Sequence, residues 1–477
     1  MRRPNPSSES ARLQVGFRPL ASKGRGYSVL VIACGNLGRV SSPGTLRPLE
    51  AQKVRRDSAP PRRRLSVLVI VFVALALRIL VITAGHTYRI TPRRDHFQFG
   101  WETGRIARSI ALGQGFASPT DLPTGPSAWT APVYPYILGG VFKVFGVYTN
   151  TSAWMILVFN SICAALTCWT LYRIAERIFS ASVARGTAWT WAVFPYAIYW
   201  PVRVVWDVCL STFLLSLALW LAIRMRDKAS TRDWIACGAL WGLIALTNTA
   251  LLILLPFMLL WIGWPVSRRT VTSAALCLAV LAICVTPWTI RNYRAFGRFV
   301  LIRDNLPLEL HEANNEAADA LWTRSEHPAN DPTAMKRFQQ LGEIRYMDET
   351  ASEFREFVRQ HPATFVQFTF QRVWYFWAAP RQATIVAGYD LWVARHMQYL
   401  ITALLAFAGL ILMFVRRNPY RWLLAPFLLV YPLPYYLVNP FTRYKHPIET
   451  VMVMLIVYVL LESKGVKLNW RLQRVTE

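Results

Sequence analysis

The chain alternates between long apolar runs and short charged segments. Several of these runs reach about 18–22 residues with almost no charge, which is the length a helix needs to cross a bilayer. We therefore predict an all-α polytopic membrane protein with about ten transmembrane helices. The predicted spans are 65–84, 151–172, 184–201, 205–223, 233–248, 249–265, 270–290, 398–415, 421–438 and 447–462.

Clusters of Lys and Arg orient these spans. Such clusters precede the first predicted span and follow the second, fourth, sixth, eighth and tenth, so all lie on one side of the membrane if the N-terminus is cytoplasmic. Both termini then face the cytoplasm, and the loops 85–150 and 291–397 face outward. The clusters are Arg62–Arg64, Arg173 and Arg177, Arg224–Arg232, Arg268 and Arg269, Arg416–Arg421, and Lys464–Arg474.

This topology divides the chain into five parts. Residues 1–64 are a basic, disordered cytoplasmic region, and 65–290 are a transmembrane bundle that includes the first outer loop, 85–150. Residues 291–397 form a polar, mainly helical outer-face region. Residues 398–462 are the C-terminal transmembrane helices, and 463–477 are a cytoplasmic tail. The apolar segment Val133–Phe145 is too short to span, so we place it at the membrane interface.

Composition supports a membrane protein and argues against nucleic-acid binding. Hydrophobic residues make up 54% of the chain, and the mean hydropathy is +0.28. The net charge of +27 is unevenly placed: residues 1–64 hold 14 Lys and Arg against three acids, whereas 291–395 hold 13 of the 26 acids. No nucleic-acid-binding motif accompanies the basic excess. No cysteine pair has a CxxC spacing, which favours buried, inert thiols.

The first outer loop carries two candidate catalytic acids, Glu102 and Asp95. Both follow the first span, and ionisable groups at the mouth of a membrane bundle are more often functional than stabilising. Trp101, beside Glu102, is placed to desolvate the carboxylate or to shape a sugar pocket. The alternative is a solvated loop acid paired with Arg105 or Arg108 at helical spacing.

A second acid, Asp207, lies at the next outer turn. Its spacing from Arg203 is that of residues on one helix face, which is typical of a structural ion pair and also fits an acid that orients Glu102 or the acceptor.

Two basic clusters lie at outer helix ends, where the topology does not account for them. One contains Arg291 and Arg294 in the sequence PWTIRNYR. The other is the run RYKHP, which contains Arg443, Tyr444, Lys445 and His446. These residues are candidates for holding a phosphate, and anchoring at the lipid headgroups is the alternative.

Polar residues of the long outer region are candidates for a sugar site, namely His311 and Asn315. His311 with Glu309 and Glu312 forms a loose set of metal ligands that matches no established spacing, so we assign no metal and no cofactor. Trp129, Tyr134 and Tyr136 are candidates for stacking on a sugar.

These motifs, in this order, resemble the GT-C superfamily of membrane glycosyltransferases, and in particular bacterial protein O-mannosyltransferase and aminoarabinose transferase-like proteins. The motifs are Gly104–Arg108, Gly113–Phe116, Ala131–Tyr136, Arg203 with Asp207, PWTIRNY from Pro287, and RYKHP from Arg443. Relatives generally carry adjacent Asp-Glu acids before the Ile-Ala-Arg stretch, and this chain has Phe99 and Gly100 there.

The resemblance implies a polyprenyl-phosphate-linked sugar as donor, inverting transfer to an acceptor on the outer face, and a first-loop carboxylate as base. The implied partners are this donor, membrane lipid and an acceptor that is a protein hydroxyl or an envelope lipid or glycan, with no nucleic acid. The implied location is the bacterial inner membrane. The alternatives are a non-catalytic relative that binds lipid-linked sugars and a lipid transporter or flippase, for which mid-membrane charges such as Arg78 would argue.

Overall fold

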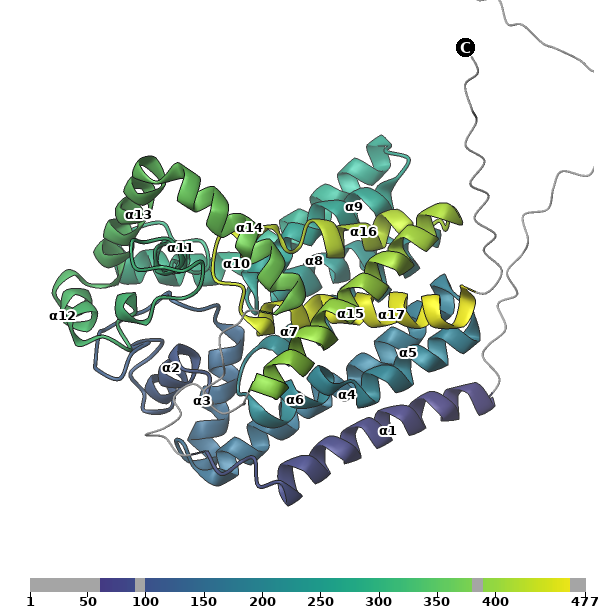
Figure 1. Cartoon of the computed structure of the whole chain (residues 1–477), viewed down its shortest axis with the longest axis horizontal. Helices are drawn as coiled ribbons and strands as arrows, with labels where there is room; N and C mark the ends of the chain where they lie inside the picture. The colour runs from purple at the N-terminus through teal and green to yellow at the C-terminus, as the bar shows by residue number, and fades with distance from the viewer. Residues whose placement is uncertain (1–60, 91–98, 380–388, 464–477) are drawn as a thin grey trace, which may run out of the picture. The chain divides into compact units, whose positions relative to one another are not determined.

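The computed structural model describes residues 61–90, 99–379 and 389–463. Helices make up all the regular structure in these ranges, and no β-strand occurs there, which confirms the all-α prediction (Figure 1). The helices of the predicted membrane part are α1 (Pro61–Ala84), α4 (Asn150–Ile178), α5 (Ala181–Val193), α6 (Pro195–Arg203), α7 (Val208–Asp227), α8 (Thr231–Ala245), η1 (Thr249–Leu254), α9 (Leu255–Gly263), α10 (Arg268–Phe296), α15 (Tyr389–Val415), α16 (Arg421–Leu429), η3 (Leu433–Tyr436), η4 (Thr442–Lys445) and α17 (His446–Glu462). The helices of the two predicted outer loops are α2 (Glu102–Ala111), α3 (Val133–Phe145), α11 (Leu306–Ala313), η2 (Arg324–Glu326), α12 (Pro332–Leu341), α13 (Glu343–Gln360) and α14 (Pro362–Ala378).

Six helices in the described part are long and apolar enough to cross a membrane. They are Val67–Ala84, Asn150–Ile178, Val208–Asp227, Arg268–Phe296, Val393–Val415 and Thr442–Glu462. Each coincides with a predicted span, and together they identify a multi-pass membrane protein. The segment Val133–Phe145 is a helix of 13 residues, as the pattern predicts.

The other four predicted spans are shorter or interrupted helices. The predicted spans 233–248 and 249–265 correspond to α8 and to η1 followed by α9. The prediction of one continuous helix over 421–438 is wrong, because α16 ends at Leu429 and the proline-rich segment after it forms only the short helix η3. Prolines at 432 and 434 cannot donate the backbone hydrogen bonds that would extend α16.

The predicted span 184–201 is divided in two at Phe194 and Pro195. Pro195 has no N–H to continue α5, so α6 starts there in a new direction. The break leaves the Ala192 carbonyl without a helical partner, and Pro201 has no N–H to donate to the Ala197 carbonyl. The buried guanidinium of Arg78 donates to these two carbonyls at 3.1 and 2.8 Å. Arg78 therefore has a structural role. Its charge within the membrane part is explained by these hydrogen bonds and no longer favours a transporter.

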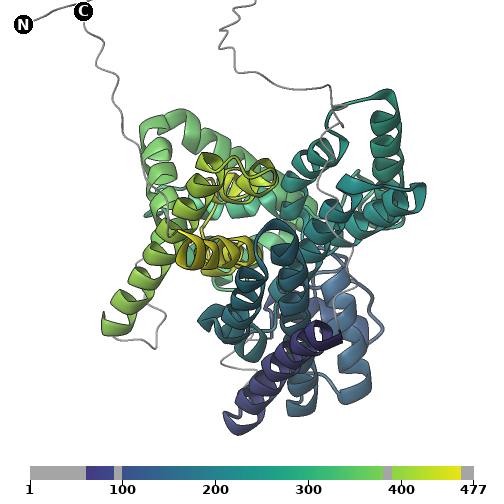
Figure 2. The same ribbon diagram turned by 90° about the vertical axis from the view of Figure 1, so that its right-hand side faces the viewer.

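Helix α4 packs against α1, α5 and α7, while α17 packs against α5, α7 and α15. Viewed along the bundle, α14–α17 lie on one side and α8–α10 on the other, with α1 at the lower edge (Figure 2). Helices α8 and α10 approach closely through glycine, because a Cβ on Gly238 would lie 2.4 Å from the carbonyl oxygen of Cys277.

The helices of the two outer loops pack together. Helix α2 packs on α3, and α11 packs on α13. A buried cluster joins Phe116 and Trp129 of the first loop to Trp288 of α10 and Phe338 of α12. This packing places the start of α2 beside the helices of the second outer region (Figure 1).

Candidate functional site

Glu102 is the first residue of α2, and a glycine fixes its position. Gly100 has φ +80°, and a Cβ on it would lie 2.4 Å from the carbonyl oxygen of Val205. Only glycine combines that conformation with so close an approach. The first loop therefore meets the junction of α6 and α7 at Gly100, two residues before Glu102. Asp95, the other candidate base, lies outside the described residues.

Glu102 is buried and hydrogen-bonded to His327, which sequence analysis missed. The His327 Nε2 lies 3.1 Å from the Glu102 Oε1, and the two residues are 4% and 8% exposed. The His327 Nδ1 accepts a hydrogen bond from the backbone N–H of Ala329 at 3.0 Å, so its proton is on Nε2 and points at Glu102. Burial acts most strongly and raises the pKa of Glu102, but His327, a backbone hydrogen bond and the charge of Arg105 together outweigh it, and the pKa is lowered. Glu102 is thus a desolvated carboxylate.

Three indole rings surround His327. Trp101 stacks on the imidazole with centroids 5.2 Å apart, and the edges of Trp129 and Trp322 lie at 5.6 and 5.9 Å. Trp322 also meets Trp101 edge to face at 5.4 Å. We call Trp101, Trp129, Trp322 and His327 the indole cage. Trp101 and Trp322 are partly exposed, so the cage offers aromatic surface next to Glu102.

The cage leads through Phe441 to the cation Arg443. The rings of Trp322 and Phe441 are 6.1 Å apart, and the Arg443 guanidinium lies 4.1 Å from the rings of both Phe441 and Trp206. Arg443 also donates to the hydroxyl of Tyr444 at 3.4 Å, while its Nε is buried with no partner among the described residues. Arg443 and Tyr444 therefore lie near the same aromatic wall as Glu102.

Asp207 lies near Arg443 but does not share a helix face with Arg203. Its Oδ2 accepts hydrogen bonds from Ser211 at 2.8 Å and from Asn248 at 3.0 Å. The prediction of an Arg203–Asp207 pair on one helix is wrong, because α6 ends at Arg203 and Val204 is extended. Helix α7 starts after Asp207, and Arg203 is exposed.

The run RYKHP does not face one site. Lys445 points its ammonium at the ring of Tyr399, 4.1 Å away, and the His446 Nδ1 pairs with Glu449 at 2.7 Å. His446 also stacks on Trp191 at 5.3 Å. The prediction of a four-residue phosphate cluster is corrected accordingly: η4 turns Arg443 and Tyr444 toward the cage, and Lys445 and His446 toward α5 and α15.

Arg291 connects α10 to the first outer loop by hydrogen bonds. It donates to the carbonyls of Ser127 and Phe116 at 2.6 and 2.5 Å. Arg291 also lines an open, mostly apolar groove of about 510 Å³ between α3 and α10, together with Pro132, Val133, Tyr136, Leu246, Cys284, Pro287 and Trp288. Arg294 is exposed on the next turn of α10.

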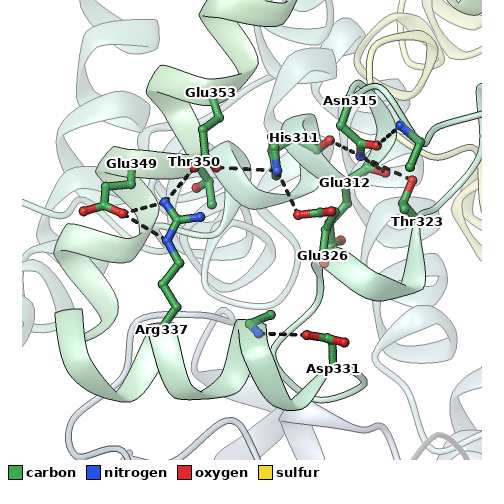
Figure 3. Close-up of polar contacts among 12 residues, drawn as sticks. His311, Glu312, Asn315, Thr323, Glu326, Asp331, Arg337, Glu349, Thr350 and Glu353 are labelled. Carbon is green, nitrogen blue, oxygen red and sulfur yellow. Dashed lines mark hydrogen bonds and ion pairs between the residues drawn. The ribbon is translucent and has the colours of Figure 1, made fainter.

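His311 and Asn315 lie in a polar network within the second outer region (Figure 3). The His311 Nε2 faces Glu326 at 3.2 Å and Glu353 at 3.5 Å, and Asn315 donates to the carbonyl of His311. Glu312 points instead toward Trp322. Within the described ranges, neither the loose set of His311, Glu309 and Glu312 nor any other group of three or more His, Cys, Asp or Glu is arranged for a metal.

No sequence signal pointed to His327. It lies 225 residues after Glu102 in the polar outer region (327 minus 102), and its neighbours Glu326 and Pro328 match no motif. Trp322 was equally hidden among 20 tryptophans, most of them expected at the membrane interface. Trp129, which the sequence did mark as a stacking candidate, lies in the cage.

The comparisons with known proteins match part of the chain. Residues 129–290 match the family model of dolichyl-phosphate-mannose-protein mannosyltransferases. No curated protein is similar in sequence at a significant level. Among solved structures, an archaeal oligosaccharyltransferase AglB from Archaeoglobus fulgidus shares 14% identity and a TM-score of 0.49 over 84% of this chain, which spans about half of that protein (51%). ArnT from Cupriavidus metallidurans shares 15% identity and a TM-score of 0.36 over 82% of this chain and 77% of its own.

The family model covers the end of the first outer loop and the helices from α3 to the outer end of α10. It includes Asp207 and Arg203 but ends before the second outer region that supplies His327 and Glu312. The match confirms the resemblance seen in the motifs: the chain is similar to the GT-C superfamily of membrane glycosyltransferases.

Proposed function

We propose that this protein is an integral-membrane glycosyltransferase, with a polyprenyl-phosphate-linked sugar as donor and an acceptor on the outer face of the bacterial inner membrane. The observation that carries the proposal is the buried Glu102–His327 pair, which lies in an indole cage that continues to Arg443. A base, an aromatic sugar platform and a cation thus occur along one continuous set of contacts.

In the proposed reaction, Glu102 takes the proton of the acceptor hydroxyl as the acceptor oxygen attacks the anomeric carbon. The bond from that carbon to the phosphate oxygen breaks, and the phosphate leaves with the electron pair. Arg443 stabilises the negative charge that grows on the phosphate. Asp207 is a further acid near Arg443, and it contributes to the orientation of the guanidinium. The groove at Arg291 and Tyr136 offers apolar surface for a lipid chain.

The test is transfer of radiolabelled mannose from mannosyl-phosphoryl-polyprenol in membranes that contain the full chain. Glu102→Gln keeps the size of the side chain and removes the base, so transfer falls by about 10²–10⁴-fold. Glu316→Gln removes an exposed acid from the second outer region and is the matched control.

Size-exclusion profiles must show that both variants fold. Unchanged transfer in folded Glu102→Gln overturns the assignment of the base. If sugar transfer is lost in Asp95→Asn instead, Asp95 is the base.

A further inference from the structure

A second buried carboxyl, Glu312, lies beside the indole cage. It is 4% exposed and sits near the end of α11. Its Oε2 accepts a hydrogen bond from the indole N–H of Trp322 at 2.9 Å. Trp322 in turn packs against Trp101 and His327. His327 is hydrogen-bonded to Glu102, and Trp101 stacks on His327. Glu312 is thus connected to the proposed base, Glu102, through the contacts of Trp322 with His327.

The surroundings of Glu312 favour its uncharged form, whereas those of Glu102 favour the carboxylate. Burial raises the pKa of Glu312 well above its ordinary value, and the nearby carboxylates of Glu309, Glu102 and Glu326 raise it further. The indole N–H of Trp322 acts in the other direction but is outweighed. Two carboxyls in one site whose surroundings push their pKa values apart have different roles, one as carboxylate and one as hydrogen-bond donor.

One oxygen of Glu312 has no hydrogen-bond partner in the described part of the chain. Oε2 already accepts from Trp322, and the Oε1 atom is buried without a hydrogen-bond partner among those residues. A buried polar group left without a partner destabilises the folded chain. Such a group is retained where a ligand supplies the missing partner.

We propose that Glu312 is a specificity-determining residue that donates a hydrogen bond from Oε1 to an oxygen of the donor sugar, while Trp322 and Trp101 provide the aromatic surface on which that sugar lies. The proposal rests on the proposed function for the class of donor. It assigns to α11 the recognition of the sugar, and to Arg443 the recognition of the phosphate. Loss of Glu312 then affects lipids that bear a sugar and spares the bare lipid phosphate.

The experiment measures binding of two lipids to the purified full chain by quenching of tryptophan fluorescence. The lipids are mannosyl-phosphoryl-polyprenol and polyprenyl phosphate of the same chain length. The natural protein is expected to bind the sugar-bearing lipid more tightly. In Glu312→Leu that preference falls about tenfold, the effect of one hydrogen bond, and binding of polyprenyl phosphate does not change.

Glu312→Gln is the matched variant, because its amide accepts from Trp322 and donates from the position of Oε1. It is expected to retain most of the preference, and it separates the hydrogen bond from mere filling of the space. Glu316→Leu removes a nearby exposed acid and reports on charge alone.

Three outcomes overturn the proposal. In the first, Glu312→Leu keeps the full preference for the sugar-bearing lipid. In the second, Glu312→Leu weakens the binding of both lipids equally. In the third, Glu312→Gln loses as much of the preference as Glu312→Leu does. If the natural protein binds neither lipid, the donor class is wrong and both proposals fail. If it binds both lipids and Glu102→Gln still transfers mannose, the base assignment fails and the role of Glu312 stands.

Discussion

One imidazole acts on the pKa of Glu102 more than any other neighbouring group. Glu102 is buried among aromatic rings, and burial alone would raise its pKa. The Nε2–H of His327 makes the largest contribution in the other direction, and the N–H of Ala329 fixes the tautomer by occupying Nδ1. His327 therefore acts on Glu102 as a positioning residue.

Replacing His327 by Ala is expected to raise the pKa of Glu102, since only a backbone hydrogen bond and the charge of Arg105 then oppose burial. A base works only while ionised, so transfer is lost as pH falls through that pKa, and in His327→Ala the loss begins at higher pH. The measurement is the pH dependence of mannose transfer. His361→Ala, at an exposed histidine, serves as control. If transfer falls at the same low pH in His327→Ala and in the natural protein, His327 does not lower the pKa of Glu102.

Gly100 provides a test of the loop that presents Glu102. Gly100→Ala adds a Cβ 2.4 Å from the Val205 carbonyl oxygen at φ +80°. Gly113→Ala imposes the same strain at φ +78° but meets nothing within 4 Å. Strain alone costs about 1 kcal/mol, so Gly113→Ala lowers the thermal unfolding temperature slightly and Gly100→Ala lowers it more. Equal shifts would mean that the loop moves away from Val205.

At the scale of helices, hydrophobic patterning located the spans but not the breaks within them. The six long helices follow from runs of apolar residues, whose periodicity and length are visible in sequence. The break at Phe194 and Pro195 depends on what satisfies the freed carbonyls. That partner, Arg78, comes from α1, more than 100 residues earlier, so no local pattern contains it.

Arg78→Leu tests this account of the break. It removes the donors to buried carbonyls on α1, α5 and α6, and each carbonyl left unsatisfied costs about 1–3 kcal/mol. The yield of folded protein by fluorescence-detected size exclusion is expected to fall strongly. Arg173→Leu, which loses only a half-exposed ion pair with Glu176, is the control and changes the yield little. Normal yield and unfolding temperature in Arg78→Leu would contradict the structural role.

For the whole molecule, the decisive contacts join the two outer regions. Glu102, Asp207 and Arg443 were identified from sequence because acids and cations at outer helix ends are unusual. The partners of Glu102 and Asp207, which are His327 and Asn248, lie far away in the chain and carry no motif. Phe441, in contrast, lies two residues before Arg443. The division of RYKHP between two faces arises from the turn η4, which residue type alone does not specify.

A second joint between the outer regions is sensitive to pH. Glu343 accepts from the N–H of Ala128 at 2.5 Å, next to Trp129 of the cage. Burial raises the pKa of Glu343 well above its usual value, with neighbouring Asp304 adding to the effect. Burial likewise raises the pKa of Asp304 to about 6. Both carboxyls hold protons more tightly in the folded chain, so they stabilise it at low pH and lose that contribution as pH rises through the folded pKa values.

Glu343→Gln is therefore expected to raise the unfolding temperature at pH 8 and to flatten its decline between pH 5 and 8. The amide oxygen of glutamine still accepts from Ala128. Thermal unfolding in detergent across this pH range gives the comparison, with Glu316→Gln as control. If the unfolding temperature of Glu343→Gln depends on pH as that of the natural protein does, Glu343 and Asp304 do not cause the pH dependence.

The bond between Glu102 and His327 also imposes an order in time. A ribosome that adds about 5–20 residues per second makes His327 roughly 10–45 seconds after Glu102. Until then the carboxylate has neither its hydrogen-bond donor nor its full cage, because Trp322 is equally late. A nascent chain inserted as far as α10 consequently lacks a finished site, as well as the last membrane helices α15 and α17. Any chemistry at Glu102 begins only when the second outer region has been synthesised and has docked on the first.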